Sequence, residues 1–240
     1  MKPVFCLRHE QPDTLGAGDA SFSWSELDAT YIDVWSGQEV PPLEEASALV
    51  VLGGSMGVPD IDRFPFLNTE LATIRDALHH SLPVLGICLG AQLLAAAAGA
   101  DVFRAPHRTL GFRSVMKLPA AASDPLFRTY CNVDRVLRWH EDTFTLPAAA
   151  ELLMTSHDLP HQAFRVGACA WGVQFHIEVD DDLLHAWLDA AGPRLQAMWG
   201  TSRDALLSEA DHYLTHQQRH SDAVFAAFAR VVRQREGRVR

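Results

Sequence analysis

One cysteine of the chain has the surroundings of a nucleophile. Cys88 is at the centre of Gly86-Ile87-Cys88-Leu89-Gly90, between an apolar strand-like run and an alanine-rich, helix-like segment. The two glycines have no β-carbon, so the chain can turn sharply there and hold Cys88 in a strained, exposed position. This pattern predicts a nucleophile elbow. The sulfur would lie at the amino end of a helix, where unpaired N–H groups favour a thiolate and stabilise an oxyanion.

A reactive cysteine needs a base, and the sequence offers one far downstream. An apolar strand-like run ends in His176-Ile177-Glu178. Side chains two residues apart on a strand point to the same side, so Glu178 can reach one imidazole nitrogen while the other faces the sulfur. Taken singly, Cys88 could be a buried structural cysteine and His176 an ordinary half-buried histidine. Together in one chain, they favour a Cys-His-Glu triad.

Several motifs resemble those of the class I glutamine amidotransferases, in particular the stand-alone proteins similar to the glutaminase domain of GMP synthetase. The resemblance covers roughly residues 4 to 190. The segments that carry it are Leu52-Gly53-Gly54-Ser55-Met56-Gly57, Gly86-Ile87-Cys88-Leu89-Gly90-Ala91-Gln92, Trp139-His140-Glu141-Asp142-Thr143, Gln162-Ala163-Phe164-Arg165-Val166-Gly167 and Gly172-Val173-Gln174-Phe175-His176-Ile177-Glu178.

The resemblance implies a reaction and a role for each triad residue. In the family, the cysteine attacks the side-chain amide of glutamine, ammonia leaves, and water hydrolyses the γ-glutamyl thioester to glutamate. By motif position, Cys88 is the nucleophile, His176 the general base and acid, and Glu178 the orienting carboxylate. The oxyanion hole would use the backbone N–H groups of Gly54 and Leu89. Gly53 and Gly54 suit this place because a side chain would block close approach of the substrate.

The same resemblance assigns the substrate contacts. Gln92, one helical turn past the nucleophile, corresponds to the family residue that binds the α-amino acid end of the substrate. Ala163 and Phe164 would add main-chain contacts.

Two positions depart from the family pattern. Ile177 stands where the family usually has proline, and this change affects no reacting group. His161 stands where the family usually has asparagine. This second departure leaves open the substrate contacts of that loop and the identity of the γ-glutamyl substrate.

Composition limits the partners and the location. The chain has 240 residues, of which 48% are hydrophobic, and its net charge of −10 repels a polyphosphate backbone. Nucleic-acid binding is therefore not expected. The amino terminus lacks the apolar core of a secretory signal, and no apolar run is long enough to span a membrane. These features predict a soluble cytoplasmic protein with no membrane partner.

The cysteines and histidines indicate no catalytic metal. Cys6, Cys88, Cys131 and Cys169 are spread singly, without the paired spacing of a zinc motif. We expect Cys6 and Cys169 to be small core residues. Ligands could come from His140-Glu141-Asp142 or from His176 and Glu178, but a thiolate triad needs no metal and the spacings match no recognised cage. The prediction is thus of no metal and no cofactor.

The rest of the chain alternates between strand-like and helix-like segments. Short apolar runs at 4–7, 31–34, 48–52 and 83–87 predict parallel strands, and 66–78 predicts a helix with Leu67, Leu71, Ile74 and Leu78 facing the sheet. Runs at 113–118, 133–139, 151–155 and 169–175 predict antiparallel additions and a return to the main sheet. The fold class is α/β, a mostly parallel, flavodoxin-like three-layer sheet flanked by helices, with the elbow at the carboxyl ends of the strands.

The last quarter of the chain differs in character. Residues 180–188 predict a helix that Gly192-Pro193 breaks, and the remainder is helix-like with an apolar stripe of Val224, Phe225, Phe228, Val231 and Val232. We expect a catalytic domain over residues 1–190 and a helical extension over 191–240. The extension would pack on the domain, although a dimerisation arm or a partner-docking surface is an alternative.

The sequence lacks a P-loop and a dinucleotide-binding glycine pattern, so no ammonia-consuming synthase is evident in this chain. One hypothesis is a glutaminase that delivers ammonia to a separate synthase. A second is a stand-alone hydrolase of γ-glutamyl amides or peptides with the same thioester chemistry. A third is a non-catalytic binding or regulatory protein on the same fold, against which the intact triad argues. The oligomeric state stays open.

Overall fold

The structure is a computed structural model that describes residues 1–239, with side chains described as far as Gly237. Its strands form one nine-stranded sheet in the order β2-β1-β3-β4-β9-β8-β7-β5-β6. The strands are β1 (Val4–Arg8), β2 (Ala29–Asp33), β3 (Ala48–Val51), β4 (Val84–Ile87), β5 (Val102–Lys117), β6 (Val133–Phe144), β7 (Ala150–Thr155), β8 (Ala163–Val166) and β9 (Ala170–Val173).

Half of the sheet is parallel, as predicted. Strands β2, β1, β3, β4 and β9 pair in parallel, so β9 returns to the main sheet beside the strand that leads to Cys88. Their residues are nearly all apolar because helices cover both faces of this half. The sequence placed these strands to within two residues at each end.

The other half is antiparallel and contains the largest differences from the prediction. Strand β5 starts at Val102, eleven residues before the predicted start at 113, and pairs with β6 across a register shift between Arg104 and Thr109. Its first part carries arginine, histidine and proline rather than alternating apolar residues, which conceals a strand. Strand β8 has only four residues, one of them Arg165, and was not predicted as a separate strand.

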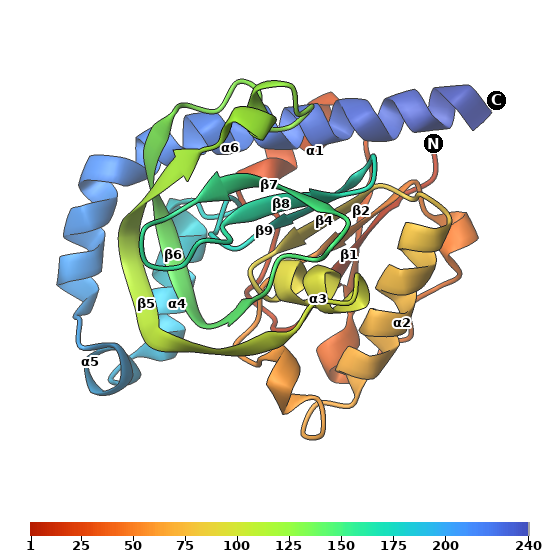
Figure 1. Ribbon diagram of the computed structural model, residues 1–240. Helices are drawn as coiled ribbons and strands as arrows, with labels where there is room; N and C mark the ends of the chain where they lie inside the picture. The colour runs from red at the N-terminus through yellow and green to blue at the C-terminus, as the bar shows by residue number, and fades with distance from the viewer. Residues whose placement is uncertain (240) are drawn as a thin grey trace.

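Helices cover the two faces of the parallel half. Val4 and Cys6 point into one core with Phe22 and the apolar stripe of the C-terminal helix, whereas Phe5 and Leu7 point into the other. Figure 1 shows α2 and α3 on one side of the sheet and α6 running along the other beside α1. The α-helices are α1 (Gly18–Trp24), α2 (Phe66–His79), α3 (Leu89–Ala97), α4 (Asp181–Ala191), α5 (Arg194–Trp199) and α6 (Arg203–Val239). Short 3-10 helices are η1 (Val34–Ser36), η2 (Leu43–Glu45), η3 (Val58–Asp60) and η4 (Pro119–Ala122).

The predicted helix at 66–78 is confirmed as α2. It buries Leu67, Leu71 and Ile74 against the sheet, with Leu78 partly buried at its end. The predicted core role of Cys6 is also confirmed, since its side chain is fully buried in β1. Cys169 differs: it lies before β9 and is only partly buried.

The C-terminal part is helical and packed on the sheet. Helix α4 ends at Ala191, just before the predicted break at Gly192-Pro193 and three residues past the predicted end at 188, and α5 follows directly. Helix α6 is 37 residues long, about 55 Å at 1.5 Å per residue. Its first turns pack against the β5–β6 ribbon, and Phe225 and Phe228 farther along meet Phe22 of α1. None of the helices that the structure describes is both long enough and apolar enough to cross a bilayer.

Candidate active site

Cys88 occupies a sharp turn between β4 and α3. Its backbone has φ +52° and ψ −105°, a strained conformation for a residue with a side chain. A β-carbon on Gly86 would lie 2.4 Å from the carbonyl oxygen of Gly90, and one on Gly90 would lie 2.0 Å from that of Val51. Only glycine fits at both positions, so the sharp turn at Cys88 requires the absence of β-carbons there, as predicted. Contrary to the exposed position predicted, Cys88 is only 5% exposed and lies in the wall of a pocket.

His176 and Glu178 lie beside the sulfur. Glu178 Oε1 accepts a hydrogen bond from His176 Nδ1 at 2.8 Å. The other ring nitrogen, Nε2, is 3.4 Å from the carbonyl oxygen of Trp139, and Cys88 Sγ is 3.7 Å from the same oxygen. The structure thus brings all three predicted residues together, from segments almost ninety residues apart in the chain.

The backbone at His176 is not part of a strand. The predicted strand at 169–175 is shorter, because β9 ends at Val173, and the His176–Glu178 segment follows it. This segment is held by β6 and α6: His176 N–H donates to Leu137 O at 3.0 Å, and Gln217 Nε2 donates to His176 O at 2.6 Å. Gln217 also accepts from Leu137 N–H at 2.7 Å. The buried amide of Gln217 therefore ties α6 to the backbone of the histidine, and no sequence motif had indicated it.

The charges of the site favour a protonated His176. Burial by itself lowers the pKa of His176, but the Glu178 carboxylate and then the Cys88 sulfur outweigh it and raise the pKa well above its ordinary value. The ring also packs edge-on against Trp187, with centroids 4.9 Å apart. An imidazolium between a carboxylate and a sulfur is the arrangement that a thiolate nucleophile needs.

The glycine loop after β3 forms the opposite wall. A β-carbon on Gly53 would be 3.4 Å from His176 Cε1 and 3.8 Å from Cys88 Cβ, and one on Gly54 would be 3.0 Å from Leu89 Cδ2. The loop therefore approaches both the histidine and the first residue of α3. In the described chain, the backbone N–H groups of Gly54 and Leu89 donate no hydrogen bond to another protein group. Two free donors are thus available beside the sulfur.

A buried ion pair supports this loop from behind. His9 Nδ1 donates to Gly53 O at 2.7 Å, and His9 Nε2 is 3.0 Å from both carboxylate oxygens of Glu70 on α2. Burial lowers the pKa of His9, but the charge of Glu70 and the hydrogen bonds to Glu70 and Gly53 together outweigh it, and the pKa is raised. A charged His9 donates from both nitrogens, which fixes the orientation of the Gly53 peptide. No sequence motif indicated this pair.

The pocket has a volume of about 350 Å³ and extends from Cys88 to α4 and α5. Part of its wall comes from the β6 residues Trp139 to Asp142, which the sequence motif at 139–143 contained but to which we had given no catalytic or substrate role. Its lining residues are Glu10, Pro12, Asp13, Gly53, Gly54, Ser55, Met56, Gly57, Asp60, Cys88, Leu89, Gln92, Arg104, Trp139, His140, Glu141, Asp142, His176, Trp187, Ala190, Ala191, Arg194, Met198 and Trp199.

The predicted substrate contacts divide into two groups. Gln92 lines the pocket and donates to Asp142 O at 3.2 Å and to Gln174 Oε1 at 3.3 Å, while Gln174 Nε2 lies 3.8 Å from Cys88 Sγ. Ala163 and Phe164 do not reach the pocket. They are fully buried in β8, whose backbone pairs with β7 on one side and β9 on the other, so their main-chain groups serve the sheet.

His161 lies next to β8 and likewise outside the pocket. Its Nδ1 donates to Phe144 O at 2.6 Å, and its ring stacks on Phe144 with centroids 5.9 Å apart. The departure from the family pattern at this position therefore concerns the packing of β6 rather than the pocket wall.

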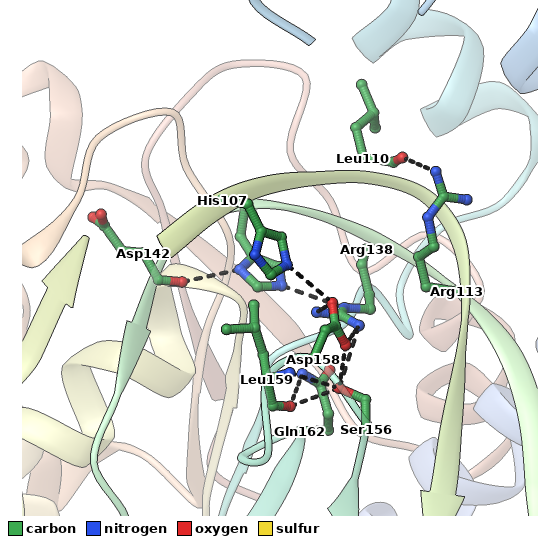
Figure 2. Close-up of polar contacts among 10 residues, drawn as sticks. His107, Leu110, Arg113, Arg138, Asp142, Ser156, Asp158, Leu159 and Gln162 are labelled. Carbon is green, nitrogen blue, oxygen red and sulfur yellow. Dashed lines mark hydrogen bonds and ion pairs between the residues drawn. The ribbon is translucent and has the colours of Figure 1, made fainter. Parts of the chain in front are cut away.

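A polar network holds the β6 wall in place. Arg138, 1% exposed, donates to both carboxylate oxygens of Asp158 at 2.8 and 3.1 Å, and Asp158 also accepts from Ser156 (Figure 2). Burial and then the neighbouring Arg138 charge lower the pKa of His140 to about 3. Neutral His140 donates from Nδ1 to Asp142 O at 2.9 Å, and its Nε2 faces Arg138 at 3.5 Å. Both nitrogens are engaged, so His140 is neither a base for Cys88 nor a metal ligand.

The outer part of the pocket is aromatic and charged. Trp139 meets Trp187 and Trp199 edge-on, with ring centroids 6.3 and 6.1 Å away. Arg104 pairs with Glu141 and lies 3.3 Å from Asp142. Trp199 belongs to α5, so residues beyond the predicted boundary at 190 also line the pocket. The division into 1–190 and 191–240 stays a prediction.

Comparisons with known proteins agree with this architecture. The family described as Glutamine amidotransferase class-I matches residues 24–185. The glutamine amidotransferase-like protein YfeJ of Salmonella typhimurium is 31% identical over 183 residues, covering 73% of this chain and 75% of that protein. A GMP synthase (glutamine-hydrolyzing) of Porphyromonas gingivalis is 33% identical over 171 residues, which are 68% of this chain but 32% of the synthase.

Solved structures give the same result for the whole chain. A glutamine amidotransferase of Thermotoga maritima superimposes with a TM-score of 0.87 at 31% identity, covering 95% of this chain and 97% of that one. A glutamine amidotransferase of Methylobacillus flagellatus also has a TM-score of 0.87, at 25% identity, with 96% and 95% covered. The match extends past residue 190 and includes most of the C-terminal helices. Sequence, fold and pocket together show that the chain belongs to the class I glutamine amidotransferase family.

Proposed function

We propose that the protein hydrolyses the γ-carboxamide of glutamine through a cysteinyl thioester, with Cys88 as nucleophile, His176 as proton carrier and Glu178 as orienting carboxylate. One observation carries the proposal: Cys88 Sγ and His176 Nε2 face the same carbonyl oxygen of Trp139, while the other nitrogen of the ring binds Glu178 at 2.8 Å. A nucleophile, a base and an orienting group in this order are the parts of a triad.

In the first half of the reaction, the Cys88 sulfur attacks the side-chain carbonyl carbon of glutamine. The carbonyl oxygen becomes an oxyanion, which the free N–H groups of Gly54 and Leu89 stabilise. When the tetrahedral intermediate collapses, the C–N bond breaks and His176 gives its proton to the nitrogen. Ammonia leaves, and the γ-glutamyl group stays on Cys88 as a thioester.

In the second half, a water molecule attacks the thioester carbon. His176, now neutral, takes the proton of this water, and Glu178 stabilises the imidazolium that forms again. The C–S bond breaks, glutamate leaves, and the thiolate–imidazolium pair is restored. The raised pKa of His176 suits this cycle, because the ring holds a proton whenever the sulfur is an anion.

The pocket offers complementary charges for an amino acid. Arg104 and Arg194 can meet an α-carboxylate, and Glu10, Asp60 and Glu141 line the same cavity and can meet an α-ammonium group. Gln92 also lines the pocket, and its side-chain amide donates to Asp142 O and Gln174 Oε1. We assign the α-amino acid end of the substrate to these residues in place of Ala163 and Phe164.

The acceptor of the ammonia is proposed to be a separate synthase. The GMP synthase of Porphyromonas gingivalis is named as glutamine-hydrolyzing, and the region similar to this chain is 32% of its length. Relatives of this chain thus include proteins in which a glutaminase-like region is joined to a larger remainder. A separate partner would supply the corresponding activity here.

Product analysis of the purified chain tests the reaction. Incubation with glutamine is expected to release glutamate and ammonia in equal amounts, and added hydroxylamine is expected to divert the thioester to γ-glutamyl hydroxamate. Failure of both products, with and without candidate synthases, would favour the non-catalytic protein on this fold. Ammonia release without any hydroxamate would contradict the thioester.

A second candidate is a hydrolase of larger γ-glutamyl amides or peptides. The tryptophans of the pocket favour it, since Trp187 and Trp199 both contact Trp139 edge-on and the three give the pocket an aromatic wall. Such a wall suits an apolar group on the leaving nitrogen, which free glutamine does not have.

A substrate panel separates the two candidates. If the wall binds a leaving group, γ-glutamyl dipeptides with aromatic side chains will have a higher kcat/KM than glutamine. Trp199→Ala will then lower kcat/KM for those dipeptides about 10-fold and leave glutamine nearly unchanged. Equal effects on both substrates would remove the second candidate.

A further inference from the structure

A second group of cysteine, histidine and carboxylate side chains lies outside the pocket, where α6 packs on the start of β6. It consists of Cys131, Asp134, His216 and His220, whose ligand-type atoms all lie within 4.8 Å of one another. The two histidines are one helical turn apart on α6, so their side chains project from the same face. None of the four lines the active-site pocket.

The distances are close to those of a tetrahedral metal site. His220 Nδ1 is 2.9 Å from Asp134 Oδ2 and 3.9 Å from Cys131 Sγ, and His216 Nε2 is 3.6 Å from Asp134 Oδ1. Zinc bound at about 2.0 to 2.3 Å from its ligands separates them by roughly 3.3 to 3.8 Å. The four atoms need only small side-chain rotations to reach that spacing.

The charges match a divalent cation. The Asp134 side chain is 2% exposed, and apart from its own segment its polar contacts are the two histidines. One thiolate, one carboxylate and two neutral imidazoles would balance the charge of a Zn²⁺ ion, and the thiol proton of Cys131 would leave as the ion binds.

Neighbouring groups leave the site to these ligands. Lys117, the nearby cation that acts on Cys131, donates to the carbonyl oxygens of Arg128 and Tyr130. The Tyr130 ring packs on His220 with centroids 4.8 Å apart and walls the buried side, while His216 is exposed and leaves a path for an ion to enter. Ion pairs with Asp134 account for both histidines, and the Cys131 thiol donates to Val133 O; a metal would bring the sulfur into the same cluster as the other three side chains.

We propose that Cys131, Asp134, His216 and His220 bind one zinc ion that clamps α6 to β6. Gln217, which holds the backbones of Leu137 and His176, lies between the two histidine ligands on α6. The ion would therefore fix the register of α6 at the turn that supports the triad histidine. Its role is structural, and no step of the proposed hydrolysis passes through it.

Cobalt and zinc binding by the full chain, without a histidine tag, tests this site. The wild-type protein is expected to bind one equivalent of Co²⁺ with a thiolate-to-metal charge-transfer band, and Zn²⁺ is expected to displace it. Because Cys88 and His176 offer another thiolate and imidazole, the same titration is run on Cys131→Ser and Cys88→Ala. The band should vanish in Cys131→Ser and persist in Cys88→Ala. The reverse pattern, or no band in any protein, overturns the proposal.

A matched pair on α6 provides a second readout. His216→Gln and His212→Gln each change an exposed histidine, and only His216 belongs to the cluster. Zinc should bind His216→Gln at least about 100-fold more weakly than His212→Gln. In excess zinc, the melting temperature of wild type and His212→Gln should rise by about 5 °C or more, and that of His216→Gln should not. Equal zinc affinity and equal thermal stabilisation in the two folded variants would contradict the proposed zinc site. Neither readout measures hydrolysis, so the result does not depend on the proposed function.

Discussion

Two clusters of this molecule combine the same kinds of side chain in different surroundings. Cys88 and His176 line a pocket and Glu178 binds the other side of the imidazole; the sulfur lies at the start of α3, where two backbone N–H groups are free. Cys131 and Asp134 meet two histidines of α6 at a place outside that pocket, and the Cys131 thiol donates to its own segment at Val133 O. The residue types alone therefore do not decide the chemistry.

The difference lies in what else each cysteine meets. Cys88 has one imidazole, a helix terminus and space for a substrate, which are the requirements of a nucleophile. Cys131 has two imidazoles and a buried carboxylate but no helix terminus directed at it, which are the requirements of a ligand set. A cysteine beside a histidine can thus serve catalysis or metal binding, and the surrounding backbone distinguishes the two.

Removal of the two sulfurs should have very different effects on turnover. Cys88→Ala is expected to lower kcat for glutamine at least about 10⁴-fold, because no other group forms the thioester. Cys131→Ala is expected to retain kcat within about 2-fold. Steady-state assays of both variants, with circular dichroism as the control for folding, measure the contrast. Wild-type-like turnover by Cys88→Ala would end the assignment of the nucleophile.

The two carboxylates provide the next contrast. Glu178→Gln keeps the shape of the side chain but removes the negative charge that orients His176 and stabilises its protonated form. The kcat should therefore fall about 10³-fold. The pKa of His176, measured by NMR titration, should fall in this variant because its main charged partner is gone. Asp134→Asn should weaken zinc binding and leave kcat within a few-fold. A large loss of kcat in Asp134→Asn without loss of fold would mean that the two clusters are not separate.

Gln217 links the clusters and tests their connection. Gln217→Leu leaves the Leu137 N–H and the His176 carbonyl without their partner, which should cost about 2–4 kcal/mol of unfolding free energy. Because the histidine backbone loses a support, kcat should fall about 10-fold with little change in KM. Denaturant unfolding and steady-state kinetics measure the two effects. The control is His212→Gln, an exposed change on the same helix, and a kcat loss of equal size there would argue against a specific link.

A buried carboxyl group near the triad should make stability depend on pH. Asp13 Oδ1 accepts from Trp187, and in the described chain Oδ2 has no hydrogen-bond partner. Burial raises the pKa of Asp13 from 3.8 to about 7, so the folded state holds a proton that the unfolded state has lost over this range. The group's contribution to stability is therefore full below pH 4 and is lost as the pH rises to about 7.

Asp13→Asn removes this titration and keeps the acceptor for Trp187. The variant should gain stability over wild type as the pH rises from 4 to 8, by about 2 kcal/mol at the upper end. Urea unfolding at several pH values measures the gain, and Asp189→Asn, at an exposed position on α4, is the control. A constant difference between variant and wild type across the range would show that Asp13 is ionised throughout.

The parts of the site that follow local rules were predictable. The elbow at Cys88 depends on the absence of β-carbons at Gly86 and Gly90, and the pairing of His176 with Glu178 depends on residues close in the chain. The parallel strands β1, β3, β4 and β9 carry apolar runs because both of their faces are buried. The proposed substrate contacts at Ala163 and Phe164 did not reach the pocket, because no local rule says which main-chain groups a neighbouring strand will occupy.

Residue types and short-range spacing were enough to predict thiol chemistry and the parallel core, because steric limits and local hydrogen bonds act between near neighbours. The walls of the pocket and their supports depend instead on tertiary contacts. The β6 residues Trp139 to Asp142, the buried pair of His9 and Glu70, Gln217 and the cluster around Asp134 each join segments far apart in the chain. These contacts form only when the strands have paired in the order of the sheet and α6 has packed across it. The burial and the electrostatic environment of each side chain depend on those tertiary contacts.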